Sequence, residues 1–354
     1  MTNTNTNTDL VSVIIPCYNV SSYVDNLHFV FKQTYPAIEL VLIDDCSTDD
    51  TWAKIQNFKQ QHVNERVIVA RNEHNQGAGK TRNLGVKLST GKFVCFWDAD
   101  DQVEPTYVEK MLSKIKQEDA DFVCCDIHLV NGNKSSVLEL TPALLAAKNI
   151  KDIQKLFFDF IPSPCNKLVK REFILDKGIE FPDIFVCEDH CWGMLLTLEA
   201  HKISFVKEQL YHYIKRDNSL SSGHDKRFVQ GVLDMTVFEY KTIIKYHLEN
   251  ELISSWKEYR VKQLTYFFNV LDKEPELLKY FAKQYLDFCE RYNIDTSEHA
   301  LPASAFAKKR LYRIIPPFIF KETRARLKKR FLEGESIIKR NELCNKLRYL
   351  ALAN

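Results

Sequence analysis

A run of aspartates stands directly behind an apolar segment in the first third of the chain. Asp98, Asp100 and Asp101 follow the sequence Phe-Val-Cys-Phe-Trp. Carboxylates two residues apart in an extended chain point the same way, so Asp98 and Asp100 would repel each other unless a cation lies beside them. A hard divalent ion, held by one or two carboxylates and completed by substrate phosphates, is the usual partner. A solvated turn or a helix N-cap would also accept these residues, but their place after an apolar strand favours the cation.

A second acidic pair, Glu188-Asp189, lies between the strand-like segment 184–186 and a predicted helix. A reaction at a hydroxyl group needs a nearby carboxylate to accept the proton, and either residue could be this general base. A capping role at the start of the helix is the alternative interpretation.

The loop at 77–81, Gly-Ala-Gly-Lys-Thr, shares its last residues with a phosphate-binding P-loop. The full pattern needs a glycine where this chain has His74, so a nucleoside triphosphatase of that type is excluded. Arg82, just inside the following helix, could still reach a phosphate, because the free N–H groups of a helix N-terminus favour anions.

Strands that alternate with helices must position these residues. Continuous apolar strands between helices predict a mainly parallel α/β sheet covered on both faces. Ligands of such sheets bind beyond the carboxyl ends of the strands, where the acidic segments 44–45 and 98–101 both fall. The predicted strands are 11–16, 39–43, 67–70 and 92–97, and the predicted helices are about 24–33, 51–61 and one from the glycine loop to about residue 88.

Beyond residue 130 the pattern becomes mainly helical. Helices are predicted at 150–160 and 191–200, around a turn-rich segment at 173–187, and a period of 3.6 runs from 227 to 292. The predicted organisation therefore has four parts: a disordered N-terminal tail at 1–9, an α/β domain at 10–222, a helical region at 223–300 and a basic amphipathic tail at 301–354.

The charge of the chain is small overall and unevenly distributed. The 354 residues carry a net charge of +2, so we expect no nucleic-acid partner. Residues 305–354 contain 14 Lys and Arg against 4 Asp and Glu, whereas the rest of the chain contains 35 against 43. The ten cysteines lack the spacing of a zinc site, the N-terminus lacks a signal-peptide core, and no apolar stretch is long enough to span a membrane. We therefore expect a cytoplasmic protein with reduced thiols.

Several segments, in one order, together resemble glycosyltransferase family 2 over about 60% of the chain. Two departures are mild: Cys46 replaces the usual glycine of the second segment, and Thr81 replaces an alanine of the third. The segments are VSVIIPCYN at 11–19, VLIDDCSTD at 41–49, the glycine loop with its helix at 75–85, DADD at 98–101, NKL at 166–168, ED at 188–189 and the Tyr, Arg and Ser pattern at 211–221.

The resemblance implies the GT-A fold, a Rossmann-like sheet with helices on both faces, followed here by a helical C-terminal region. It also implies inverting transfer of a hexose or N-acetylhexosamine from a UDP-sugar to a saccharide, in bacterial capsule, surface polysaccharide or lipo-oligosaccharide (lipopolysaccharide) synthesis. The residues it implies are Pro16 beside the uracil, Tyr18 and Asp45 holding it, Asp98 at the ribose, Asp100 at a Mn²⁺ or Mg²⁺ ion, and Asp189 as the catalytic base.

Two other functions remain open at this point. A nucleotidylyltransferase also uses a parallel sheet, a metal and carboxylates, but it would favour a basic glycine-rich loop after the first strand, where this chain has residues 16–19, Pro-Cys-Tyr-Asn. A non-catalytic sugar-nucleotide-binding module would not need Asp189 beside an intact metal motif.

The basic tail also has two interpretations. It could be a solvated helical extension that packs on the acidic body. It could instead lie on an anionic membrane surface, because a helix with a basic face and an apolar face binds in the interface. The resemblance favours a peripheral membrane protein, since many bacterial members act on lipid-linked acceptors at the inner face of the cytoplasmic membrane.

Overall fold

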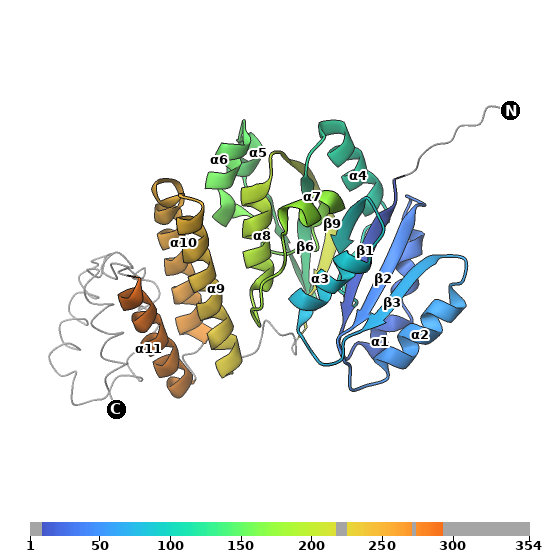
Figure 1. The fold of residues 1–354 in the computed structure, drawn as a ribbon, viewed down its shortest axis with the longest axis horizontal. Helices are drawn as coiled ribbons and strands as arrows, with labels where there is room; N and C mark the ends of the chain where they lie inside the picture. Colours follow the sequence, from blue (N-terminus) through green and yellow to red (C-terminus); the bar gives the residue numbers. More distant parts are fainter. Residues whose placement is uncertain (1–8, 217–224, 271–273, 293–354) are drawn as a thin grey trace. The chain divides into compact units, whose positions relative to one another are not determined.

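In the computed structural model, four parallel strands form the half of the sheet that carries the predicted donor site (Figure 1). β1 (Val11–Cys17) lies between β2 (Ile38–Asp44) and β4 (Phe93–Phe96), and β3 (Arg66–Arg71) pairs with the other side of β2. Nearly all residues of β1, β2 and β4 are buried, which is the pattern of strands covered on both faces. Because these strands are parallel, the segments that follow β2 and β4 emerge at the same edge.

The structure describes residues 9–216, 225–270 and 274–292. The chain divides into two compact units, 1–220 and 221–354, and the sheet with its helices belongs to the first. The predicted four-part organisation stays a prediction, and its tail at 301–354 lies outside the described residues.

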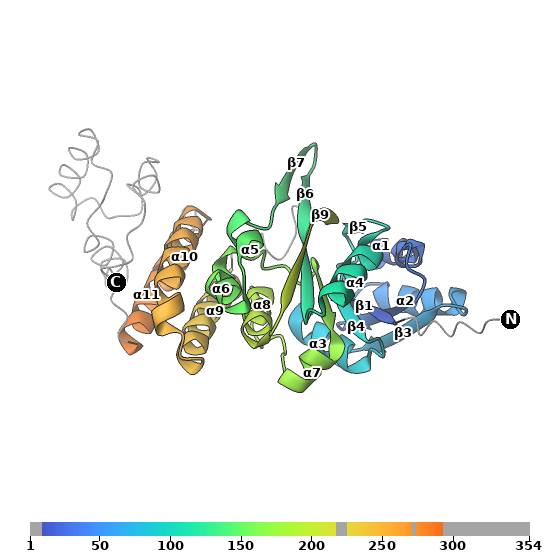
Figure 2. The ribbon, with the colours of Figure 1, turned by 90° about the horizontal axis from the view of Figure 1, so that it is seen from above.

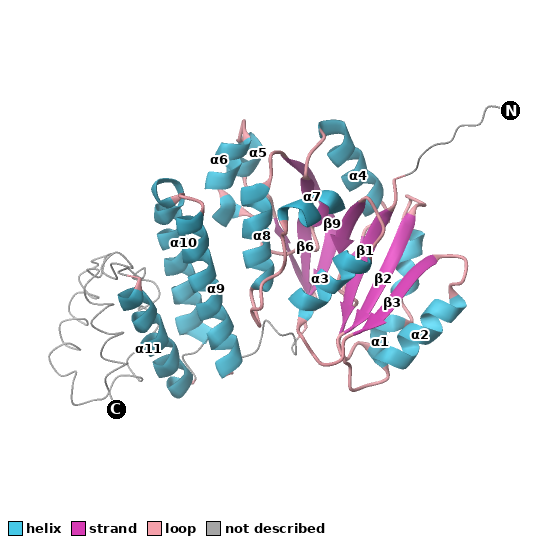
Figure 3. Ribbon diagram, in the orientation of Figure 1, coloured by secondary structure: helices cyan, strands magenta, loops and turns pink. Residues whose placement is uncertain are grey.

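The second half of the sheet is mixed in direction, and Figure 3 shows β6 and β9 within it. β8 (Lys167–Lys170) lies antiparallel between β4 and β6 (Phe122–Asn131), and β6 runs parallel to β9 (Ile203–Ile214). β5 (Gln102–Val103) pairs with β9, and β7 (Lys134–Leu138) forms a hairpin with β6 that projects from the sheet (Figure 2). The predicted α/β class is confirmed, with the expected parallel pairing concentrated in the first half.

Helices cover both faces of this sheet, and Figure 2 shows α4 on one side and α3 on the other. Ile55 and Met111 belong to the core beneath α2 and α4, whereas Val86 and Trp192 belong to the core beneath α3 and α8. The helices of this unit are α1 (Ser21–Val24), α2 (Thr51–Gln61), α3 (Ala78–Leu88), α4 (Tyr107–Glu118), α5 (Pro142–Ala146), α6 (Ile150–Lys155), α7 (Arg171–Lys177) and α8 (Glu188–Glu199), with 3-10 turns η1 (Leu27–Lys32) and η2 (Phe157–Asp159).

Three predicted elements are wrong. The helix expected at 24–33 is instead the short α1 followed by η1, and α7 occupies the start of the segment expected to be turns. The strand-like segment 184–186 is a series of bends, and α8 begins directly after it at Glu188. Asn83 exchanges two 2.9 Å hydrogen bonds with the backbone of Phe181, so the chain just before this segment is tied to α3.

Two helical glycines provide a matched test of how closely α3 packs on β1. A Cβ atom on Gly85 would lie 2.3 Å from Cγ2 of Ile14, whereas a Cβ atom on Gly193 in α8 would have no atom within 4 Å. We expect Gly85→Ala to lower the free energy of unfolding by about 1–3 kcal/mol, because overpacking forces the helix off the strand. Gly193→Ala should leave it unchanged or raise it by up to about 1 kcal/mol, since alanine favours the helix.

Urea unfolding of the two variants, followed by circular dichroism, measures this difference. Equal stability of both variants would show that α3 does not need the close contact with Ile14.

The second unit contains three described helices, α9 (Lys226–Lys245), α10 (Glu249–Val270) and α11 (Pro275–Arg291). Glu239 on α9 forms a buried ion pair with Arg260 on α10 at 3.0 Å, and it accepts a 2.9 Å hydrogen bond from Trp256. Within the described part of the chain, no helix is both long enough and apolar enough to cross a membrane.

Candidate active site

Asp45 follows β2 and organises the glycine loop. Its Oδ1 atom accepts hydrogen bonds from Asn72 at 2.7 Å and from the backbone N–H of Gln76 at 2.9 Å, and its Oδ2 atom accepts from the N–H of Gly77 at 2.8 Å. Gly77 has a φ of +85°, a conformation that favours glycine. Asp45 is buried, and its carboxylate holds the loop that leads into α3.

Pro16 and Tyr18 lie beside Asp45 at the end of β1. Pro16 is in register with Ile43 of β2, and the N–H of Asp45 donates to the carbonyl of Cys17 at 2.7 Å. The side chain of Tyr18 is 46% exposed and offers an aromatic face at this edge of the sheet. The structure therefore brings the three predicted uracil-binding residues together; their roles stay predictions.

The segment 98–101 is a turn rather than the extended chain expected from the sequence. The N–H of Asp101 donates to the carbonyl of Asp98, and two residues of β9 bind the side chain of Asp101. Both oxygens of Asp101 are used, because Oδ2 accepts from the hydroxyl of Tyr211 at 2.6 Å and Oδ1 accepts from the N–H of Ile214 at 2.8 Å. Asp98 and Asp100 do not bind β9 through their carboxylates, and each pairs with an arginine instead.

Asp98 and Asp100 are neutralised in different ways. Asp98 accepts a 2.9 Å hydrogen bond from Arg82, whose side chain is only 7% exposed. Asp100 forms a 2.8 Å ion pair with Arg216, and both of these side chains are partly exposed. Burial, and then the charge of Asp98, raises the pKa of the Asp100 carboxyl group. Negative charge is therefore crowded in this turn.

Arg82 joins the aspartate turn to α8. Its second Nη atom donates to Oε1 of Glu188 at 3.2 Å, and its guanidinium lies 5.6 Å from the ring of Phe181. Its buried Nε atom has no hydrogen-bond partner among the described residues. The predicted phosphate contact stays a prediction, but the structure places Arg82 between the two acidic motifs.

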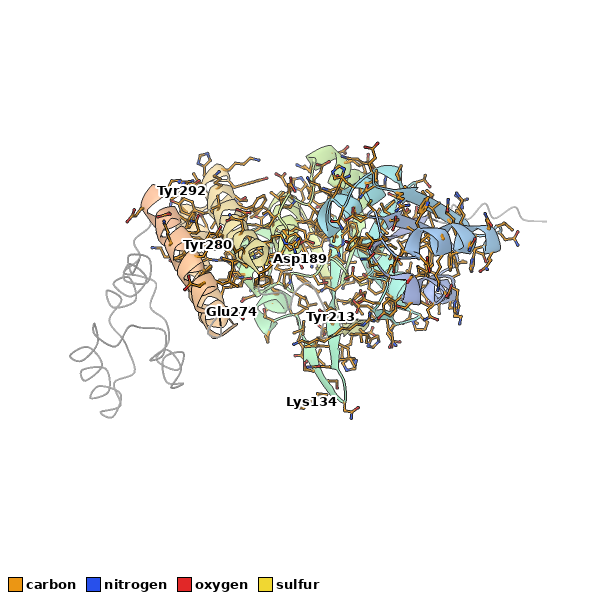
Figure 4. The ribbon with its side chains drawn as sticks, turned by 90° about the horizontal axis from the view of Figure 1, so that it is seen from below. Lys134, Asp189, Tyr213, Glu274, Tyr280 and Tyr292 are labelled. Carbon is orange, nitrogen blue, oxygen red and sulfur yellow. The ribbon has the colours of Figure 1, made fainter. Side chains whose placement is uncertain are left out.

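Glu188 and Asp189 form the first turn of α8, and Figure 4 marks Asp189. A helix N-terminus favours ionised carboxylates, but burial prevails here. Burial, and then the charge of Asp189, raises the pKa of Glu188 to about 7, and burial raises the pKa of Asp189 as well. A carboxylate with a raised pKa is a stronger base that still loses its proton near neutrality.

Gly79 allows this helix end to approach α3. A Cβ atom at Gly79 would lie 2.8 Å from Cγ of Glu188 and 3.0 Å from Cβ of Phe181. The glycine loop thus has two structural functions: Gly77 makes the turn, and Gly79 leaves room for the acidic pair.

Three residues that sequence reasoning left without a role are part of the site. Lys167 is buried and donates to the carbonyls of Ile161 at 2.9 Å and Ser163 at 2.6 Å. Burial lowers its pKa, and its charge interacts with the carboxylate of Asp189. Tyr211 and Arg216 contact the aspartate turn from β9 and the residues after it. All three stood in the segments that carried the family resemblance, but their partners are far away in the sequence.

The predicted divalent ion fits these residues. No three His, Cys, Asp or Glu side chains in the described part of the chain form a complete ligand set of their own. One or two carboxylates completed by phosphate oxygens are nevertheless a common arrangement for Mg²⁺. Asp100, with Asp98 beside it, supplies such oxygens in a turn where negative charge is crowded.

Comparisons with known proteins agree with this geometry. A family model described as Glycosyl transferase family 2 matches residues 12–195. The chain is 26% identical to the glycosyltransferase GlyG of Streptococcus pneumoniae serotype 4 over 303 residues, which cover 81% of this chain and 96% of GlyG.

Two solved structures share the fold. One is Staphylococcus aureus TarS in complex with UDP-GlcNAc, with a TM-score of 0.59 and 23% identity over 78% of this chain and 81% of that chain. The other is the mannosyltransferase PcManGT of Pyrobaculum calidifontis with GDP-Man and Mn²⁺, with a TM-score of 0.51 and 14% identity over 92% of this chain and 85% of that chain. These similarities confirm the predicted GT-A fold.

Proposed function

The chain belongs to glycosyl transferase family 2 and is a glycosyltransferase, and we propose that it transfers a hexose or N-acetylhexosamine from a UDP-sugar to a saccharide hydroxyl group with inversion. The observation that carries this proposal is the bridge made by Arg82, which donates to Asp98 at 2.9 Å and to Glu188 at 3.2 Å. Donor binding and proton removal must take place at one reaction centre, and this bridge joins Asp98, proposed for the donor, to Glu188, the neighbour in α8 of the proposed base Asp189.

The donor binds at the edge formed by β1, β2 and β4. The exposed ring of Tyr18 offers a face for the uracil beside Asp45 and Pro16, and the UDP-GlcNAc in the related TarS structure supports UDP as the nucleotide. A Mn²⁺ or Mg²⁺ ion bound at Asp100 would neutralise charge on the leaving diphosphate.

Asp189 is the base for the acceptor. As the acceptor oxygen forms its bond to the anomeric carbon, its proton passes to a carboxylate oxygen of Asp189. The bond from the anomeric carbon to the diphosphate oxygen breaks with its electron pair, and UDP leaves. Attack from the face opposite the leaving group inverts the anomeric centre, and Arg82 holds Glu188 beside the base throughout.

A donor screen tests this proposal. The purified full chain is incubated with UDP-Gal, UDP-Glc, UDP-GlcNAc, UDP-GalNAc or GDP-Man, with Mn²⁺ or Mg²⁺ and a mixed saccharide acceptor panel, and released nucleotide is measured. UDP release that depends on an acceptor, with an anomeric configuration opposite to that of the donor in the product, is the expected result. Release of pyrophosphate would indicate a nucleotidylyltransferase, and binding of UDP without any release would indicate a non-catalytic module.

We also propose that the acceptor is lipid-linked or part of a surface polysaccharide, and that the basic tail holds the enzyme on an anionic membrane. Each Lys or Arg near such a surface gains about 1 kcal/mol. The full chain should therefore sediment with anionic vesicles at low salt and be released at high salt, whereas a variant ending at Ala303 should stay in solution. A full chain that does not sediment with these vesicles at low salt would contradict the membrane role.

A further inference from the structure

We propose that Arg216 is an exchangeable counter-ion: it holds Asp100 when no donor is bound, gives Asp100 up to the divalent cation, and then binds the diphosphate of the donor. This inference rests on the proposed function, because it assumes a nucleoside diphosphate leaving group. It goes further in assigning a role to a residue outside the predicted nucleotide and metal contacts.

The aspartate turn itself shows which carboxylate can change partner. Asp101 gives both oxygens to β9, so it belongs to the fold. Asp98 is paired with Arg82, which is almost fully buried and is also tied to Glu188. The side chain of Asp98 is 33% exposed, but that of Arg82 is only 7% exposed and cannot leave easily. In the third pair both side chains are partly exposed, Asp100 at 37% and Arg216 at 28%, so both partners can reach a ligand.

Arg216 has a second contact that would keep it in the site if it lost its contact with Asp100. Its Nη1 atom contacts Oδ2 of Asp100 at 2.8 Å, and its Nη2 atom donates to the backbone carbonyl of the same residue. Its guanidinium also lies 4.1 Å from the ring centre of Tyr23 on α1. The stack on Tyr23 keeps the guanidinium in place if the contact with the carboxylate is lost, because a cation is attracted to an aromatic face.

The exchange of partners keeps positive and negative charges paired. A partly exposed ion pair contributes little, so a divalent cation can displace the guanidinium from the carboxylate. The donor brings diphosphate oxygens to the same place, and the planar guanidinium fork matches phosphate oxygens in a bidentate arrangement. Each negative group thus keeps a cationic partner before and after the donor binds.

This predicts that two affinities change in opposite directions in Arg216→Gln. The affinity for Mn²⁺ alone should rise by up to about fivefold, the factor that corresponds to a surface ion pair. The affinity for UDP in the presence of Mn²⁺ should fall, and turnover should fall by about 10²-fold, the cost of losing one donor to a developing negative charge. Arg216→Lys keeps the charge but not the fork, so its Mn²⁺ affinity should stay near wild type while turnover still falls.

Arg71 supplies the matched control. It pairs at 2.9 Å with Asp44, the last residue of β2, and lies over the ring of Trp52. Like Arg216 it therefore contacts one aspartate and one aromatic ring, but its aspartate is buried and is not a predicted metal ligand. Arg71→Gln should leave the Mn²⁺ affinity unchanged, which separates a local exchange from a change in net charge. Near-ultraviolet circular dichroism of each full-length variant verifies that the fold is retained.

Electron paramagnetic resonance of free Mn²⁺ and calorimetry with UDP provide the two affinities. An Arg216→Gln variant whose Mn²⁺ affinity is unchanged or lower would overturn the exchange at Asp100. A variant that binds Mn²⁺ more tightly but keeps wild-type UDP affinity and turnover would overturn the transfer to the diphosphate. Failure of the proposed function is a separate result, because the Mn²⁺ measurement needs neither a donor sugar nor an acceptor.

Discussion

Asp189→Asn is expected to lower turnover by about 10²–10⁴-fold while UDP binding stays close to that of the wild type. The amide keeps the size of the side chain and can still accept the hydrogen bond from the N–H of His190, which lies 2.7 Å from Oδ1. It cannot accept the proton of the acceptor hydroxyl group. Turnover with saturating donor and acceptor, together with calorimetry of UDP, separates the loss of the base from a loss of binding.

Glu188→Gln is the matched control for this variant. Glu188 is the neighbouring carboxylate and pairs with Arg82, so its loss should disturb the site without removing the base. The variant is expected to keep a larger fraction of turnover than Asp189→Asn. An inactive Glu188→Gln beside an active Asp189→Asn would mean that Glu188 is the base.

The pH profile gives a second test of the same pair. Both pKa values are raised, that of Glu188 to about 7, so protons stay on the pair at a pH where ordinary carboxyl groups have lost them. The base works only when it is deprotonated, and burial raises the pKa of Asp189, so kcat/KM should decline with falling pH before the range in which ordinary carboxyl groups bind protons. A decline in the wild type only near pH 4 would argue against a buried base.

Asp100→Asn is the second variant with a large expected effect. Loss of this charge should nearly abolish transfer, by about 10³-fold, because a cation on the diphosphate contributes several kcal/mol to the transition state. The fold should be retained, since Asp100 is partly exposed and Asp101 keeps its bonds to β9. Initial rates with saturating metal and the thermal midpoint of unfolding measure the two effects.

Asp119→Asn is the control for this change. Asp119 is 91% exposed, pairs with Lys170 and has a left-handed backbone conformation that asparagine also adopts, so activity should be unchanged. Excess chelator should inactivate the wild type as Asp100→Asn does, and added Mn²⁺ or Mg²⁺ should restore it. Full activity in excess chelator would rule out the metal assignment.

Local pattern was enough to predict the first half of the sheet. The apolar runs around β1, β2, β3 and β4 are continuous, and the predicted helix at 51–61 coincides with α2. A parallel sheet places the ends of such strands at one edge, so the sequence by itself determined that Asp45 and Asp98 would both lie there. These features depend on residues within one element, which is why a single sequence reveals them.

Only the tertiary structure decided which charges meet. Arg82 reaches Glu188 across 106 residues of sequence, and Arg216 reaches Asp100 across 116. The antiparallel β8 is inserted between β4 and β6, and this arrangement sets the second half of the sheet. Strand direction and ion pairing over such separations depend on how distant segments pack, and hydrophobic periodicity within one segment carries no information about that packing.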